Sequence, residues 1–316
     1  VSDFAFKKGA VKEGTDILAG ENELYELPTE PFSGIEQLCW SPDSRFIAYS
    51  CRKLTGKKYA FSTNTEIYIY NVTTGECGMI DKGSQKMDGY DTDPVWSPDG
   101  NSLAWISMER DGYEADRQRL MVACVDWSTV KEDGSGLPSV KHPETIDFKY
   151  NVTAPVWSDD SQDIYFSALA EGIQGIYKCH YGKNGAEGCW ERVTGEDMWY
   201  DFGSPFYIKS DEDGSTTLLT TWCSMDFPTE MVAVKFIPRE QRTASGKSVL
   251  KAEGPVAEGE VTYTQITHEN DHILSQLAEH DTEARWMETV DGKQMLTWVL
   301  YPPQFDPAKE YPAITI

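Results

Sequence analysis

The side chains best suited to bind a charged ligand lie in one short acidic segment, residues 109–114. Glu109 and Glu114 enclose an Arg-Asp-Gly-Tyr stretch that begins with Arg110. Two carboxylates hold an ammonium group well, because one charge pair at about 4 Å gains about 4 kcal/mol at an effective dielectric of about 20. We therefore expect Glu109, Arg110 and Glu114 to bind the amino end of a ligand. The alternative is a solvated loop in which Arg110 pairs with a neighbouring carboxylate.

A second motif, His268-Glu269-Asn270-Asp271-His272, matches the H-E-x-x-H pattern of zinc peptidases. In those enzymes the motif lies on a helix, so that both histidines share one face and bind the metal. Here the preceding residues, 261–266, alternate like a strand, and Asn270-Asp271 is typical of a turn. The sequence therefore predicts that His268 and His272 lie at a strand end and in a surface loop, without a common metal.

Three aspartates, Asp88, Asp91 and Asp93, could suggest a calcium loop. Their spacing lacks the glycine and the terminal glutamate of such a loop. A turn before Pro94 is the better interpretation, and we expect no metal and no cofactor.

The elements that position these residues follow from an internal repeat. A Trp-Ser-Pro-Asp type turn with apolar runs on both sides occurs at Trp40, Trp96 and Trp157, and a weaker fourth copy follows at 203–220. Proline presets the backbone for the first turn position, and aspartate caps the turn through its own backbone. Each copy continues with a third and a fourth β-prone run.

Four antiparallel strands recurring every roughly 40 to 60 residues are typical of β-propeller blades. We expect an all-β chain with four four-stranded blades as part of a larger propeller. The blades are predicted at 35–80, 93–150, 153–194 and 203–267, and the acidic segment 109–114 lies between two strands of the second. The corresponding domain assignment is a blade remnant at 1–34, which contains the run 23–27, and propeller blades at 35–280.

The last segment, 281–316, departs from the repeat. Residues 285–289 and 294–300 form a predicted hairpin around Asp291-Gly292-Lys293. A loop with Tyr301-Pro302-Pro303 and Phe305-Asp306-Pro307 follows, and residues 313–316 start a further strand. We interpret this segment as the start of a truncated second domain.

The repeats and this tail resemble the prolyl oligopeptidase family of serine peptidases, and within it the dipeptidyl peptidase V group. The tail Tyr301-Pro302-Pro303-Gln304-Phe305-Asp306-Pro307 is the most specific feature, and the resemblance runs from about Gly34 to Ile316. It implies that segment 281–316 begins an α/β-hydrolase domain. It also implies that the whole protein removes dipeptides from peptide amino ends through a serine acyl-enzyme, while the propeller controls access to the catalytic site.

The chain departs from the family pattern in two ways. Family propellers have seven or eight blades, and about four are visible here. No Gly-x-Ser-x-Gly nucleophile elbow occurs, so no residue can be assigned to the Ser-Asp-His triad. We expect no catalytic residue in this chain, a missing hydrolase domain as its partner, and a peptide substrate only in the whole protein.

Charge and cysteine content limit the other partners. The net charge of the 316-residue chain is −24, which repels phosphate backbones and argues against nucleic acid. No run is long and apolar enough to cross a membrane. Seven cysteines leave at least one unpaired; Cys179 and Cys189 could face each other across a turn, either bridged or as two buried thiols.

The resemblance implies a periplasmic or secreted protein, although no signal peptide opens this sequence. Four blades cannot close a seven- or eight-fold ring, so we also expect exposed blade faces, covered by residues 24–27 or by a neighbouring chain in a homodimer.

Three other functions stay open at this stage. A binding propeller similar to the TolB proteins would show the same repeats but would not need the tail from Arg285 to Ile316. An acylaminoacyl peptidase would share both features. A glycoside hydrolase propeller would need two central carboxylates about 5 to 10 Å apart.

Overall fold

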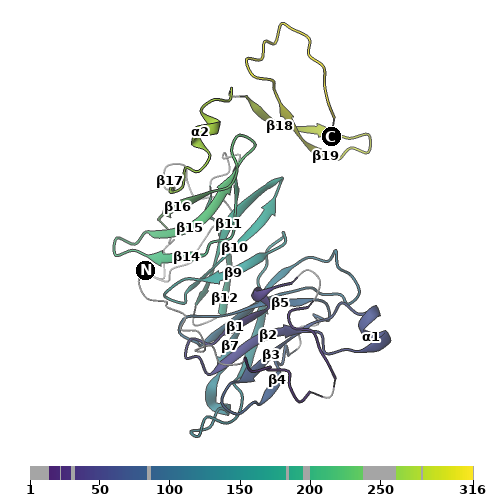
Figure 1. Cartoon of the computed structure of the whole chain (residues 1–316), viewed down its shortest axis with the longest axis vertical. Helices are drawn as coiled ribbons and strands as arrows, with labels where there is room; N and C mark the ends of the chain where they lie inside the picture. The colour runs from purple at the N-terminus through teal and green to yellow at the C-terminus, as the bar shows by residue number, and fades with distance from the viewer. Residues whose placement is uncertain are drawn as a thin grey trace. The chain divides into compact units, whose positions relative to one another are not determined.

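The structure is a computed structural model of the chain. It describes residues 14–21, 23–29, 33–83, 87–182, 185–194, 200–237, 261–278 and 280–315, without the side chains of 182 and 185–189. The described part is almost entirely β-structure, and antiparallel four-stranded sheets follow one another along the chain (Figure 1). The all-β prediction and the predicted repeat of propeller blades are therefore confirmed.

Each of the first three sheets is a meander in which consecutive strands are neighbours. The first contains β1 (Leu38–Trp40), β2 (Phe46–Cys51), β3 (Glu66–Asn71) and β4 (Cys77–Met79). The second contains β5 (Asp91–Trp96), β6 (Ser102–Ser107), β7 (Arg119–Asp126) and β8 (Ser139–Thr145). The third contains β9 (Thr153–Trp157), β10 (Asp163–Ala170), β11 (Ile173–Gly182) and β12 (Gly185–Arg192).

The turn between the first two strands of these sheets uses the same contacts each time. The serine hydroxyl donates a hydrogen bond to the aspartate two residues later, at 2.7 Å for Ser41–Asp43 and at 2.6 Å for both Ser97–Asp99 and Ser158–Asp160. The last turn residue is left-handed in all three, with φ of 60° at Ser44, 72° at Gly100 and 62° at Ser161. Local sequence chemistry thus fixes where each second strand starts.

The fourth sheet differs because its first strand is interrupted. β13 (Asp201–Phe202) and β14 (Tyr207–Ser210) both pair with β15 (Thr216–Cys223), which continues to β16 (Glu230–Phe236) and β17 (Val261–Gln265). The residues between β13 and β14 contain Pro205, which has no N–H to donate to the ladder. This interruption explains why the fourth copy of the repeat is weak in the sequence.

The chain divides into two compact units. The first comprises residues 1–96, 100–116 and 123–143, and the second comprises residues 97–99, 117–122 and 144–316. This division does not test the predicted domain assignment, which stays a prediction.

In the first unit, one face of the first sheet is covered by the segment that precedes it. Ile17, Leu18, Tyr25 and Leu27 pack against the face of β2 that carries Ile47, Tyr49 and Cys51. Residues 23–27 form no strand, although the run was predicted as part of a blade remnant. Leu24 is fully exposed, so the covering is made by its neighbours in the segment.

In the second unit, the third and fourth sheets share one apolar core. Its buried members come from β10, β11, Val193 after β12, and all the strands of the fourth sheet except β17. They include Tyr165, Ile176, Leu218 and Phe236. A separate hairpin of β18 (Thr282–Glu288) and β19 (Gln294–Leu300) follows. Trp286 and Leu300 lie on the same face of this hairpin and are more than half exposed.

Helices are few and short among the described residues. They are η1 (Ile35–Gln37), α1 (Gly56–Phe61), η2 (Trp127–Thr129) and α2 (Asp271–Leu274). None of them has the length and apolar character needed to cross a membrane. The sequence did not predict α1, whose Thr55 makes no side-chain cap hydrogen bond.

The predicted pairing of Cys179 with Cys189 is shifted by one position. The backbone register places Cys179 opposite Trp190, beside an irregularity in the ladder of β11 and β12. The side chain of Cys189 lies outside the described residues.

Candidate functional site

The acidic segment 109–114 lies in the connection between β6 and β7, as the sequence predicted. Glu109 and Glu114 are exposed, and the strand that leads into the connection is buried from Leu103 to Ser107. A rigid strand therefore carries a polar loop. We refer to residues 109–114 as the acidic loop.

The start of the acidic loop is closed by Asp116, a largely buried carboxylate. It accepts hydrogen bonds from the backbone N–H groups of Glu109 at 2.9 Å and Arg110 at 3.0 Å. The Arg110 guanidinium lies 3.5 Å from the other carboxylate oxygen and 4.0 Å from the centre of the Tyr113 ring. Arg110 is thus engaged within its own connection, as the alternative interpretation expected for its side chain.

The middle of the acidic loop is tied to the segment between α1 and β3. Asp111 Oδ1 accepts hydrogen bonds from the Ser62 hydroxyl at 2.8 Å and from the N–H groups of Thr63 and Asn64 at 2.9 and 3.2 Å. Although burial acts in the opposite direction, these donors together hold the pKa of Asp111 below its usual range. Asp111 is therefore a structural anion that fixes the loop.

The two remaining carboxylates, Glu109 and Glu114, project from this fixed backbone. The Glu114 side chain makes no hydrogen bond or ion pair with any residue that the structure describes, and its carboxylate faces solvent. Such a carboxylate can accept a hydrogen bond from an incoming ammonium group. Their role in binding stays a prediction.

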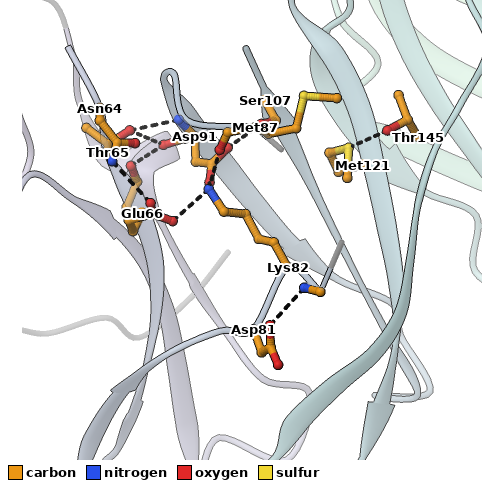
Figure 2. A network of polar contacts seen from close by, with 12 residues as sticks. Asn64, Thr65, Glu66, Asp81, Lys82, Met87, Asp91, Ser107, Met121 and Thr145 are labelled. Atoms are coloured by element: carbon orange, nitrogen blue, oxygen red, sulfur yellow. Dashed lines mark hydrogen bonds and ion pairs between the residues drawn. The ribbon is translucent and has the colours of Figure 1, made fainter. Parts of the chain in front are cut away.

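Figure 2 shows a buried polar network around Lys82, which includes Ser107, two residues before the acidic loop. The Lys82 ammonium lies 2.8 Å from Glu66 Oε2 and 2.9 Å from Asp91 Oδ2, and it donates to the Met87 carbonyl at 2.5 Å. The Asp91 side chain is completely buried, and those of Lys82 and Glu66 are 12% and 19% exposed. Ser107, the last residue of β6, donates its hydroxyl hydrogen to Asp91 Oδ1.

Burial raises the pKa of Asp91 to about 7, although Lys82 and Ser107 act in the opposite direction. For Lys82, Asp91 and Glu66 raise the pKa against the effect of burial. Asp91, the first residue of β5, therefore pairs with the Lys82 ammonium. Asp93, two residues later, accepts a hydrogen bond from the Thr92 hydroxyl at 2.8 Å. Among the residues that the structure describes, no three acidic, histidine or cysteine side chains gather to hold a metal ion.

The H-E-x-x-H segment is held by a buried carboxylate of β16. Glu230 accepts hydrogen bonds from the Thr267 hydroxyl and from both the backbone and the side-chain nitrogen of Asn270, and these contacts lower its pKa. His268 Nδ1 lies 2.9 Å from Asp271 Oδ2. The prediction of a loop was wrong for His272, which lies in the one-turn helix α2, because residues 270–275 close consecutive helical hydrogen bonds.

A cavity of about 410 Å³ lies within the second unit, beside the terminal hairpin. Its lining includes Tyr200, Asp201, Asp226, His280 and Trp298. Within this lining, His280 Nδ1 lies 3.1 Å from Asp226 Oδ1. The sequence did not single out this cavity.

Sequence reasoning also missed the network around Lys82. Its members come from three strands and the connection between β4 and β5, so no local pattern links them. The one available signal was a carboxylate, Asp91, at the start of a strand that is otherwise buried.

Comparison with known proteins places this geometry in context. No protein-family model matches the chain. Among curated proteins, it is 39% identical over 307 residues to dipeptidyl-peptidase 5 of Porphyromonas gingivalis, a match that covers 97% of this chain and 37% of that protein. The corresponding protein of Porphyromonas endodontalis is 37% identical over 304 residues, with 96% of this chain and 37% of that protein covered.

Two solved structures also show similarity, at low identity. A putative dipeptidyl aminopeptidase IV from Bacteroides ovatus matches with a TM-score of 0.36 and 14% identity, covering 87% of this chain and 46% of that one. Prolyl oligopeptidase B from Galerina marginata matches with a TM-score of 0.40 and 10% identity, covering 86% and 38%. The chain thus spans little more than a third of the length of the curated relatives that it matches.

Proposed function

Since the chain is a homologue of the dipeptidyl-peptidase 5 proteins over nearly its whole length, we propose that it is the propeller part of a serine peptidase that removes dipeptides from the amino ends of peptides. The homology confirms the resemblance deduced from the repeats and the Tyr-Pro-Pro tail. The serine nucleophile, the control of access by the propeller and the fragment nature of the chain belong to the proposal.

One observation supports a role for the acidic loop. The connection between the second and third strands of the third sheet, at Gly172, touches the terminal hairpin: a Cβ on Gly172 would lie 2.6 Å from Leu296 Cδ2 and 3.4 Å from Trp298 Nε1. The acidic loop is the same connection, between the second and third strands, of the second sheet. It therefore has the corresponding position within its own blade.

This position gives the loop a direct chemical task. Asp111 and Asp116 accept hydrogen bonds from backbone N–H groups and hold the loop, and Glu109 and Glu114 are exposed on it. The two glutamates bind the free ammonium of the peptide and so place the second peptide bond at the serine of the remaining domain. Electrostatic contacts that fix a substrate in this way raise the specificity constant.

The test compares two substrates in the full-length protein. Glu109→Gln and Glu114→Gln remove one negative charge each and keep the shape. Loss of a charge-assisted hydrogen bond costs about 1.5 to 3 kcal/mol, roughly ten- to a hundredfold in kcat/KM, for a dipeptide substrate with a free amino group. An N-acylated substrate has no ammonium and should be cleaved as before.

A matched control is Glu212→Gln, which removes an exposed carboxylate from a turn of the fourth sheet. It should leave both substrates unaffected. Equal losses on both substrates for the Glu109 and Glu114 variants would show damage to the loop, and no loss on either would refute the role of these residues.

The remaining parts of the proposal concern the whole protein. Because this sequence contains no nucleophile elbow, we expect the isolated chain to show no turnover with dipeptidyl substrates. A periplasmic or secreted location, a hydrolase domain as partner and a homodimer through blade edges complete the proposal.

A further inference from the structure

We propose that Lys82 is a positioning residue for the acidic loop: it holds the loop at three points, and substitution of this one lysine releases all three. The link to substrate rests on the proposed function, but the positioning itself does not. A lysine ammonium has three hydrogens to donate. Here the ammonium donates to Asp91 Oδ2 and to the Met87 carbonyl, and it forms an ion pair with Glu66 Oε2 at 2.8 Å.

The first point is reached through the Met87 carbonyl. The next two residues, Asp88 and Gly89, donate their backbone N–H groups to the carbonyls of Glu109 and Met108, both at 3.1 Å. These bonds extend the ladder of β5 and β6 to the first residue of the acidic loop. Lys82 therefore fixes the segment against which Glu109 is held.

The second point is reached through Asp91. Its Oδ1 accepts the Ser107 hydroxyl, while Oδ2 faces Lys82. The backbone of Asp91 is itself held by Thr65, whose Oγ1 accepts from Asp91 N at 2.9 Å and donates to Asp91 O at 2.5 Å. Figure 2 shows the contact between Ser107 and Asp91. Because Ser107 lies two residues before Glu109, this contact sets the direction in which β6 enters the loop.

The third point is reached through Glu66. Its Oε1 accepts from Asn64 Nδ2 at 3.1 Å, and the backbone of Asn64 donates to Asp111 in the middle of the acidic loop. Beside it, Thr63 Oγ1 accepts from Gly112 N at 2.9 Å. The segment 62–64 thus connects the carboxylate that faces Lys82 to the part of the loop before Glu114.

The charge of Lys82 matters because both of its anionic partners are largely buried. Without the ammonium, the carboxylates of Asp91 and Glu66 would remain close together in a poorly hydrated site, which they avoid by taking up a proton or moving apart. Either response breaks contacts that lead to the acidic loop. Lys82 therefore sets the geometry of the acidic loop without contacting the ligand itself.

The experiment measures backbone hydrogen exchange in the full-length protein for Lys82→Met, which keeps the length of the side chain and removes its charge. The amides of Asp88, Gly89 and Gly112 should exchange about tenfold faster or more, because their acceptors lose their support. The amide of Asp163, the first residue of β10 in the third sheet, serves as the internal reference. Lys57→Met, at an exposed lysine of α1, is the matched control and should change none of them.

A second variant covers the case in which Lys82→Met does not fold. The double variant Lys82→Met with Asp91→Asn keeps the net charge of the cluster at −1 and should show the same faster exchange at Gly112. Unchanged exchange at all three amides in whichever variant folds would overturn the proposal.

Kinetics separate this inference from the proposed function. If both hold, Lys82→Met raises KM for free-amine dipeptide substrates about tenfold, with little change in kcat and none for N-acylated substrates. Faster exchange with unchanged KM would support the positioning by Lys82 while refuting the role of the loop in substrate binding. Unchanged exchange with a raised KM would overturn the positioning and leave the proposed function standing.

Discussion

The ammonium group of Lys82 lies 2.9 Å from the carboxylate of Asp91, which is completely buried at the first position of β5. The pair links the connection between β4 and β5 to the first strand of the second sheet. The Ser107 hydroxyl donates a hydrogen bond to the same carboxylate. A buried ion pair of this kind contributes more to a defined geometry than to net stability, because desolvation offsets much of the attraction.

The first prediction concerns pH. The pKa of Asp91 is 3.8 in its ordinary state and about 7 in the folded protein, so the folded state binds the proton more tightly. The contribution of Asp91 to stability is therefore fully present below pH 3.8 and is lost as the pH rises through about 7. Urea unfolding of the wild type and of Asp91→Asn at several pH values isolates this contribution. The wild type should lose stability relative to the variant as the pH rises from about 4 to about 7. A difference in unfolding free energy that stays constant or grows in favour of the wild type would contradict the assignment.

The second prediction concerns the repeated turn. Gly100 has a φ of 72°, and alanine in the left-handed region costs about 1 to 2 kcal/mol, partly offset by a less flexible unfolded chain. Gly100→Ala should therefore lower the free energy of unfolding by about 1 kcal/mol. Ser44, with a φ of 60°, occupies the same turn position in the first sheet, and Ser44→Gly is the reverse control. A loss of stability in that control would show that the left-handed backbone is not the cause.

The third prediction concerns the contact between the third sheet and the terminal hairpin. Gly172 and Gly214 have nearly equal φ values of 83° and 81°, but a Cβ on Gly214 would meet nothing within 4 Å. Both alanine variants should share the backbone cost of about 1 kcal/mol. Gly172→Ala should lose about 1 to 3 kcal/mol more, because its methyl group would overlap Leu296.

Hydrogen exchange identifies the origin of that difference. Amides of residues 294–300 should exchange faster in Gly172→Ala and stay unchanged in Gly214→Ala. Equal effects of the two substitutions would mean that the hairpin does not rest on the Gly172 turn.

The fourth prediction concerns the H-E-x-x-H segment. His268 pairs with Asp271, and Glu230 holds Thr267 and Asn270, so contacts within the chain already organise the segment. His272→Ala should leave the metal content of the purified protein unchanged, as measured by elemental analysis. Stoichiometric zinc that disappears on this substitution would show that the two histidines share a metal.

The repeat and most of the strands can be predicted from the sequence alone. Ser41, Ser97 and Ser158 each bond to an aspartate two residues away, so the information that starts each second strand is local. The alternation of apolar residues then defined the strands that follow, and the predicted blade at 35–80 corresponds to strands from Leu38 to Met79. The position of the acidic loop followed from the same pattern.

The roles of the individual charges in that loop depend on the tertiary structure. Asp111 and Asp116 resemble Glu114 in the sequence, but they accept hydrogen bonds from residues 62–64 and from the backbone of the loop, whereas the Glu114 carboxylate faces solvent. The same holds for Lys82, whose partners Glu66 and Asp91 lie 16 and 9 residues away. Their meeting depends on strand register and on the packing of one sheet connection against another, and these are set by long-range contacts that no local pattern of residues encodes.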